Sequence, residues 1–196
     1  MNITVEIVKE LRERTGAGVL DCKKALVETQ GDLEAAARVL RERGLAEAAK
    51  RANREAREGR IECYVHHGSR IASMVELNCE TDFVAHTEEF INLAHELAMQ
   101  VAATSPRFLA VEDVPEEVLA EERTVARSKI EGNKPEHIIE RIVEGRLKKF
   151  YEEACLLEQS SIRDPEYKVK DQIIEVSAKT GENIVLRRFA RFEVGA

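Results

Sequence analysis

Residues 78–85 read Asn78-Cys79-Glu80-Thr81-Asp82-Phe83-Val84-Ala85, and the pattern of the chain changes from strand to helix across them. The residues before this stretch alternate between apolar and polar side chains, whereas an amphipathic helix pattern follows it. A corner of this kind faces solvent. Phe83 therefore either turns inward, with Asp82 capping the helix near residue 87, or projects outward beside that acid as a probe for another molecule. The local pattern leaves both alternatives open.

Upstream of the corner, two alternating runs predict a β-hairpin. Apolar residues alternate with polar ones from residue 60 to 65 and again from 71 to 77. We expect a loop one residue longer than a two-residue turn. That register puts the face with Ile61 opposite Val75 and Leu77, which buries more apolar surface.

Downstream of the corner, the period changes to that of helices. A helix should begin at Thr87-Glu88-Glu89, where two acids complement the helix N-terminus. Pro115 and Pro135 each open a further helix, and a shorter helix extends from about 168 to 181. The last segment, 183–194, alternates again as a strand. The expected fold class is α+β, with a small antiparallel sheet covered by helices.

The first 44 residues predict three short helices packed as a bundle, because none of them would fold singly in water. Asp32 is a natural N-cap for the third helix, and Gly44 is expected to end it. Residues 45–59 are rich in Ala, Arg, Glu and Lys, which is typical of a solvated helical connector. The predicted domains are therefore a three-helix domain over 1–44, the connector over 45–59 and an α+β core over 60–196.

The 196 residues carry a net charge of −7, which argues against general nucleic-acid binding. The four cysteines form no C-x-x-C pair, and their apolar surroundings predict buried thiols in a reducing compartment. They are Cys22, Cys63, Cys79 and Cys155. The sequence shows neither a signal-peptide pattern nor an apolar stretch long enough to span a bilayer. These features predict a soluble cytoplasmic protein.

Motifs for bond chemistry are mostly missing. The chain has no P-loop pattern, and residues 95–99 fall short of H-E-x-x-H because Met99 replaces the second ligand. Cys79 precedes a helix, which can activate a thiol, although free cysteines are among the most buried residues. We predict no enzyme, no metal and no cofactor. A thiol- or metal-dependent enzyme built on Cys63, Cys79 and the histidines is the alternative.

Charge is distributed unevenly around the corner. No Lys or Arg occurs between Arg70 and Arg107, whereas that span contains six acids. They are Glu76, Glu80, Asp82, Glu88, Glu89 and Glu96. Such a surface would either steer a partner of complementary charge or form an ordinary solvated face.

Several segments together resemble one family. Residues 15–18 (TGAG) and 21–26 (DCKKAL) resemble the N-terminal module of elongation factor Ts, and residues 78–85 resemble the most distinctive motif of its core. Residues 144–150 (EGRLKKF) are similar to a third segment of the same family. The resemblance implies a three-helix domain similar to ubiquitin-associated domains. It also implies guanine-nucleotide exchange on the translation GTPase elongation factor Tu, without bond chemistry.

The resemblance also implies which residues contact the GTPase. The Thr81-Asp82-Phe83-Val84 corner would disturb the magnesium ion that is bound there with GDP. The remaining candidates are two apolar residues, which stand where the family commonly has two Met, and three residues at basic contact positions. They are Val19 and Leu20, and Arg12, Lys23 and Arg51.

The chain carries one of the two core halves that many family members have, so the resemblance implies a homodimer through the core. Phe189 and Phe192 on the last strand are the expected contact, because an unpaired edge strand invites a second copy. Two further alternatives stay open. One is an adaptor that binds a partner through its three helices without releasing nucleotide, and the other is RNA binding by the connector.

Overall fold

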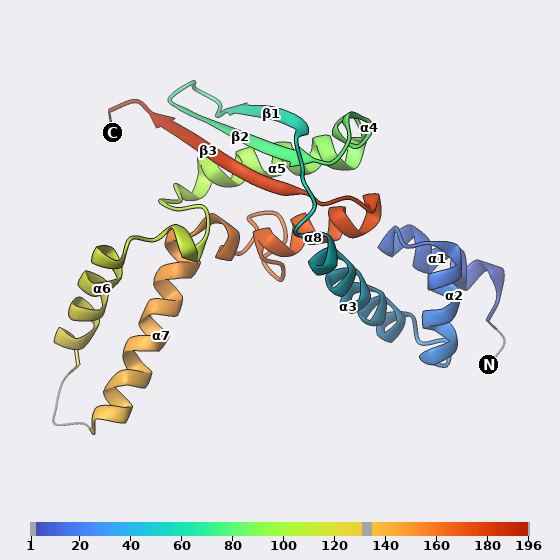
Figure 1. Cartoon of the computed structure of the whole chain (residues 1–196), viewed down its shortest axis with the longest axis horizontal. Coiled ribbons are helices and arrows are strands. Elements are labelled where there is room, and N and C mark those ends of the chain that lie inside the picture. The colour runs from blue at the N-terminus through green and yellow to red at the C-terminus, as the bar shows by residue number, and fades with distance from the viewer. Residues whose placement is uncertain (1–2, 131–134, 196) are drawn as a thin grey trace. The chain divides into compact units, whose positions relative to one another are not determined.

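The structure is a computed structural model, which describes residues 3–130 and 135–195. Contacts divide the chain into two compact units. The first contains the residues up to Arg60 together with Leu77–Leu93 and Asp171–Arg187. The second contains Ile61–Glu76, Ala94–Lys170 and the residues from Arg188 onward. Figure 1 labels the helices and strands of both units.

Three helices near the N-terminus form a small bundle around an apolar core. They are α1 (Val5–Thr15), α2 (Val19–Glu28) and α3 (Leu33–Arg51), drawn in blue to teal in Figure 1. The buried residues of this core are Leu11, Cys22, Ala25, Leu26, Ala36 and Leu40. Asp32 caps α3 as predicted, because its Oδ1 accepts a hydrogen bond of 3.0 Å from the Ala35 N–H.

The prediction that Gly44 ends the third helix is wrong, because α3 continues through it to Arg51. A Cβ atom at position 44 would lie 3.0 Å from the Cβ of Ala178 on α8 (Val169–Thr180). The glycine therefore lets two helices pack closely instead of breaking one of them. The expected connector over 45–59 is helical only as far as Arg51, and the predicted domain boundaries stay a prediction.

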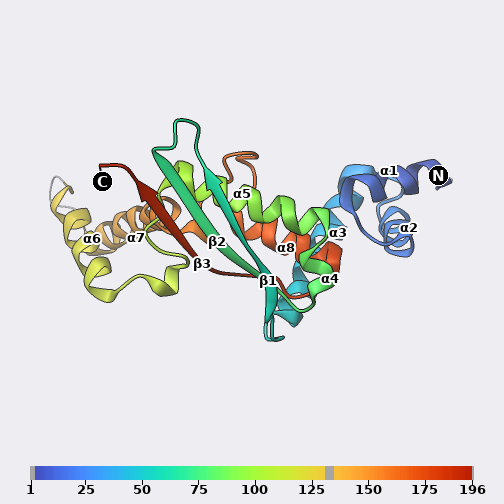
Figure 2. The ribbon, with the colours of Figure 1, turned by 90° about the horizontal axis from the view of Figure 1, so that it is seen from above.

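The three strands form one sheet, and the α+β class is confirmed. The strands β1 (Glu58–Val65), β2 (Ile71–Cys79) and β3 (Val185–Glu193) lie in the order β1-β2-β3. Figure 2 shows them side by side, with α5 (Glu88–Thr104) running along the sheet. Every second residue of β2 from Ser73 onward is buried, and the Ser73 hydroxyl donates a hydrogen bond of 2.6 Å to the Ala98 carbonyl of α5. These contacts define an inner face of the sheet, which α5 covers.

The alternation of β1 is predicted correctly, but the face of the strand that is buried is not. Ile61 and Val65 are each 60 % exposed, and Cys63 is exposed as well. The half-buried residues that alternate with them are Glu62 and Tyr64, which contact His95 of α5. An alternating pattern distinguishes two faces without saying which one a helix covers. The expected burial of the Ile61 face and of the Cys63 thiol is therefore wrong, whereas the other three cysteines are buried.

The remaining helices of the second unit begin where the sequence predicts. α6 (Glu116–Ser128) follows Pro115, and α7 (Glu136–Ala154) follows Pro135. The two pack side by side through Ala126, Val143 and Leu147. Short 3-10 turns, η1 (Val111–Asp113) and η2 (Leu156–Glu158), flank this pair. The predicted start of α5 is also confirmed, and its buried residues include Phe90, Leu93, Leu97 and Val101.

Candidate functional site

The corner between β2 and α5 contains a single helical turn, α4 (Asp82–Ala85). Thr81 precedes the turn with an extended backbone, φ −129° and ψ 154°. Ala85 is buried, whereas Phe83 is 81 % exposed. The alternative in which Phe83 packs inward is therefore wrong, and the ring projects from the corner into solvent.

Local hydrogen bonds fix the backbone of this turn. The His86 Nδ1–H donates to the Asp82 carbonyl at 2.6 Å, and the Thr87 hydroxyl donates to the Val84 carbonyl at 2.8 Å. The carboxylates of Asp82, Glu88 and Glu89 have no ion pair with any residue that the structure describes. The corner thus presents an aromatic ring and several unpaired negative charges on a well-bonded turn.

A carboxylate from a distant loop binds the entrance to the turn. Glu182, between α8 and β3, accepts a 3.0 Å hydrogen bond from the Glu80 N–H and a 3.1 Å bond from the Thr81 N–H, both at Oε2. Its Oε1 accepts a third bond, of 2.6 Å, from the Thr81 hydroxyl. The N-cap residue Thr81 makes no side-chain capping bond to the turn. Glu182 therefore supplies acceptors that the local sequence does not.

The loop that carries Glu182 is itself hydrogen-bonded, both to the corner and to the segment that follows α3. The Asn183 N–H donates to the Glu80 carboxylate at 2.7 Å, and Arg54 approaches the same oxygen at 3.4 Å. The buried amide of Asn183 donates to the carbonyls of Ala52 and Arg54 at 3.3 and 2.7 Å. The corner and the loop thus exchange hydrogen bonds in both directions.

The predicted contact residues near the N-terminus lie mostly on one exposed strip of α2. Val19 and Leu20 are 52 % and 73 % exposed, and Lys23 follows one turn later. Val27 continues the strip at 59 % exposure, although the helical pattern of the sequence suggests a core position for it. We call Val19, Leu20, Lys23 and Val27 the α2 strip. Their shared exposure, which periodicity alone does not reveal, separates them from the buried Cys22 and Leu26.

The two predicted arginines differ in their surroundings. Arg12 on α1 is exposed. The Arg51 side chain is only 16 % exposed, and its Nη1 donates to the Ser177 carbonyl at 3.3 Å. Arg12 is thus open to a partner, whereas Arg51 also joins α3 to α8.

The cysteines and histidines do not assemble into a reactive site. Burial raises the pKa of Cys79 to about 11, and the nearby Glu182 carboxylate adds to this rise, so the thiolate is disfavoured at neutral pH. His95 pairs with Glu62 at 3.3 Å, and Glu96 pairs with Arg163. Within residues 3–130 and 135–195, no three His, Cys, Asp or Glu side chains are arranged to hold a metal ion. These observations give a thiol- or metal-dependent reaction no support.

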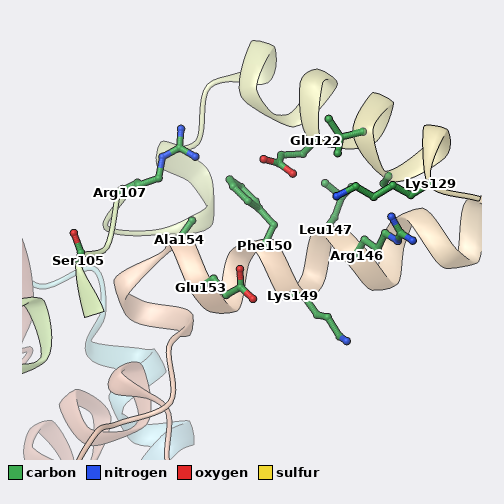
Figure 3. A pocket seen from close by; sticks show the side chains of 12 residues that line it. Ser105, Arg107, Glu122, Lys129, Arg146, Leu147, Lys149, Phe150, Glu153 and Ala154 are labelled. Atoms are coloured by element: carbon green, nitrogen blue, oxygen red, sulfur yellow. The ribbon is translucent and has the colours of Figure 1, made fainter. Parts of the chain in front are cut away.

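One hollow, of about 520 Å³, lies beside α6 and α7 (Figure 3). Apolar residues such as Leu147 and Phe150 line it together with charged residues. The charged ones are Arg107, Glu122, Lys129, Arg146, Lys149 and Glu153. No His or Cys belongs to the described lining, so the hollow offers neither a thiol nor an imidazole base. In the part of the chain that the structure describes, no helix has the length and apolarity needed to cross a membrane.

The corner and the α2 strip expose apolar side chains, which is typical of surfaces that bind another macromolecule. A sequence model of the family described as "Elongation factor TS" matches residues 32–196. Elongation factor Ts of Caldanaerobacter subterraneus subsp. tengcongensis is 59 % identical over 194 residues, which cover 98 % of this chain and 97 % of that protein. Elongation factor Ts of Herpetosiphon aurantiacus is 55 % identical, with both chains covered completely. The chain belongs to the elongation factor Ts family, and hence to the factors of translation elongation.

Proposed function

We propose that this chain is a guanine-nucleotide exchange factor for elongation factor Tu. Membership of the elongation factor Ts family implies this activity in general. The observation that carries the proposal is the exposure of Phe83 beside Asp82 on a turn that side-chain hydrogen bonds hold at the Asp82 and Val84 carbonyls. The protein would act in the cytoplasm on GDP and Mg²⁺ held by its partner, with no cofactor of its own.

An exchange factor needs no bond chemistry, since it only has to bind the nucleotide-free state of the GTPase more tightly than the loaded state. GTPases hold the nucleotide through a P-loop, a helix N-terminus and Mg²⁺. The Phe83 ring would insert between packed elements of the partner, and Asp82 would place negative charge near the phosphates and the metal. Thousandfold faster release requires about 4 kcal/mol of differential binding, of which one buried ring supplies roughly 3 kcal/mol.

Docking would use a different surface from the one that displaces the nucleotide. The α2 strip offers three apolar side chains and one cation, and Arg12 adds a second cation from α1. Apolar side chains that become buried on association contribute affinity, and charges at the rim of an interface steer the encounter. We therefore assign affinity to the α2 strip and nucleotide release to the corner, with Thr81 and Val84 completing the contact.

The outer face of the sheet supports the proposed homodimer. Four of its large apolar residues are exposed: Ile61, Val65, Met74 and Phe192. Arg191 donates to the Ala102 carbonyl of α5, so the next residue of β3, Phe192, points to the opposite face. A second copy of the chain would cover this outer face with Phe192 at the contact. The half-buried Phe189 lies two residues before Arg191, and hence on the face of Arg191 instead.

The test is the release of a fluorescent GDP analogue from elongation factor Tu, followed with and without this chain. The unmodified protein should accelerate release, and Phe83→Ala combined with Asp82→Ala should lower the stimulated rate at least tenfold. Its melting temperature should stay unchanged, because the ring contributes little to the fold. Ile162→Ala, which also truncates an exposed apolar residue, serves as the control and should keep full activity.

Full stimulation by the corner variant would contradict the mechanism. Binding without any acceleration by the unmodified chain would favour an adaptor instead.

A further inference from the structure

We infer that Glu182 is a positioning residue, which holds the corner in the orientation from which Phe83 and Asp82 reach the partner. The inference rests on the proposed function and extends it to a residue that projects no group toward the GTPase. Glu182 lies about a hundred residues after the corner, at a sequence separation of 101 from Thr81.

The first argument is the geometry of the carboxylate. Both of its oxygens are used, and together they accept three hydrogen bonds from two consecutive residues, Glu80 and Thr81. Hydrogen bonds to a charged acceptor are stronger and more directional than neutral ones. Two adjacent N–H groups and one hydroxyl on the same carboxylate fix the direction in which the chain enters α4, and hence the direction of the Phe83 ring.

The second argument is that the residues on both sides of the Glu182 carboxylate are themselves hydrogen-bonded. The Ser177 hydroxyl of α8 donates to the Glu182 carbonyl at 2.5 Å, and Asn183 is buried with its amide on the carbonyls of Ala52 and Arg54. The Glu80 carboxylate accepts a hydrogen bond from the Asn183 N–H. These hydrogen bonds tie the Glu182 side chain to α8, and through it they connect the corner to α8.

The third argument concerns what an exposed probe requires. Phe83 has too little contact with its own chain to fix its direction by packing. A probe that is free to move loses conformational entropy when it inserts, and that loss reduces the free energy available to displace the nucleotide. Preorganisation by Glu182 removes this loss without adding any contact to the interface.

The experiment measures nucleotide release at a series of exchange-factor concentrations, which separates the maximal rate from the half-saturating concentration. Glu182→Ala should lower the maximal rate about tenfold, while the half-saturating concentration changes less than twofold because the α2 strip is intact. Glu182→Gln keeps one carbonyl oxygen and should give an intermediate rate. Glu175→Ala removes an exposed acid of α8 that pairs with Lys179, and it should resemble the unmodified protein.

A direct readout is the amide proton resonances of Glu80 and Thr81 in the free protein. Both should shift upfield and lose protection from hydrogen exchange in Glu182→Ala, whereas Glu175→Ala should leave them in place. Should Glu182→Ala fail to fold, Glu182→Gln decides the question with the same two measurements.

The outcomes separate this inference from the proposed function. If Phe83→Ala with Asp82→Ala impairs release but the folded Glu182 variants do not, the positioning role is wrong and the corner mechanism stands. If the corner variant keeps full stimulation, the corner mechanism fails and the inference fails with it. An equal loss in Glu175→Ala, or a rise in half-saturating concentration alone, would also overturn the role of Glu182.

Discussion

Phe83 and Ala85 show how one short turn assigns two different roles to neighbouring residues. Positions two apart on a helical turn point in nearly opposite directions, so burying Ala85 sends Phe83 outward. A ring left in water forgoes roughly 2–3 kcal/mol that burial would contribute. That cost fits a side chain whose apolar surroundings are supplied by another molecule.

Two buried thiols make the stability of the protein sensitive to alkaline pH. Burial raises the pKa of Cys79 and of Cys155 to about 11, helped by the negative charges of Glu182 and Glu158 respectively, from an ordinary value of 9.0. The folded pKa values lie above the unfolded value. Their contribution to stability is therefore complete below about pH 9 and is lost as the pH rises from there through about 11.

We expect the free energy of unfolding, measured by urea denaturation, to fall between pH 9 and pH 11. Cys79→Ala with Cys155→Ala should flatten this fall, because the double variant has no buried thiol to protect from ionisation at these positions. Cys63→Ala is the matched control, since Cys63 is exposed, and should leave the slope unchanged. An equally steep fall in the double variant would rule out this cause.

At the scale of elements, the start of β1 depends on one glycine. Gly59 has a φ of 146°, and a Cβ there would lie 2.1 Å from the Leu77 carbonyl oxygen of β2. Gly59→Ala should lower the free energy of unfolding by at least about 2 kcal/mol, through backbone strain and this clash together.

Gly68→Ala provides the comparison for that measurement. Gly68 also has a positive φ, of 83°, but a Cβ there would meet no atom within 4 Å. Gly68→Ala should lower the free energy of unfolding by about 1 kcal/mol, from backbone strain alone. Similar urea midpoints for the two variants would show that the close approach of β1 to β2 is unimportant.

The α2 strip leads to a prediction about affinity. Leu20→Ala should raise the half-saturating concentration for GDP release about tenfold while leaving the maximal rate unchanged, because it removes a docking contact and not the corner. Val5→Ala on α1 truncates an equally exposed apolar residue outside the strip and should change neither quantity. A lower maximal rate in Leu20→Ala would show that docking and release share one surface.

The sequence predicts elements well and their orientation less well. Proline positions and helical periodicity locate α5, α6 and α7, because both are local signals. Local signals do not predict that Gly44 allows α3 to pack closely against α8. They also do not predict that the Ile61 face of β1 lies away from α5. The role of Glu182 cannot be predicted from the residues around it, because its carboxylate accepts hydrogen bonds from a backbone segment that is distant in sequence.

At the scale of the whole molecule, the outer face of the sheet determines the predicted oligomeric state. Sedimentation should give a dimer for the unmodified chain, and Phe192→Asp should shift it to a monomer, because an unpaired charge would be buried at the contact. Ile162→Asp adds the same charge at an exposed site away from the sheet and should remain dimeric. A monomer for the unmodified chain at micromolar concentration would remove the proposed interface.

The hydrogen bonds of Glu182 have a consequence for how the protein is made. Ribosomes release the N-terminal helices and the Phe83 turn long before residue 182 emerges, and contacts that distant in sequence form late. A nascent chain would thus form the N-terminal bundle first and order the turn that carries Phe83 last. Pulse-labelled hydrogen exchange during refolding should show the amides of Glu80 and Thr81 gaining protection after those of the bundle. On the proposed function, an incomplete chain would then bind the GTPase without releasing its nucleotide.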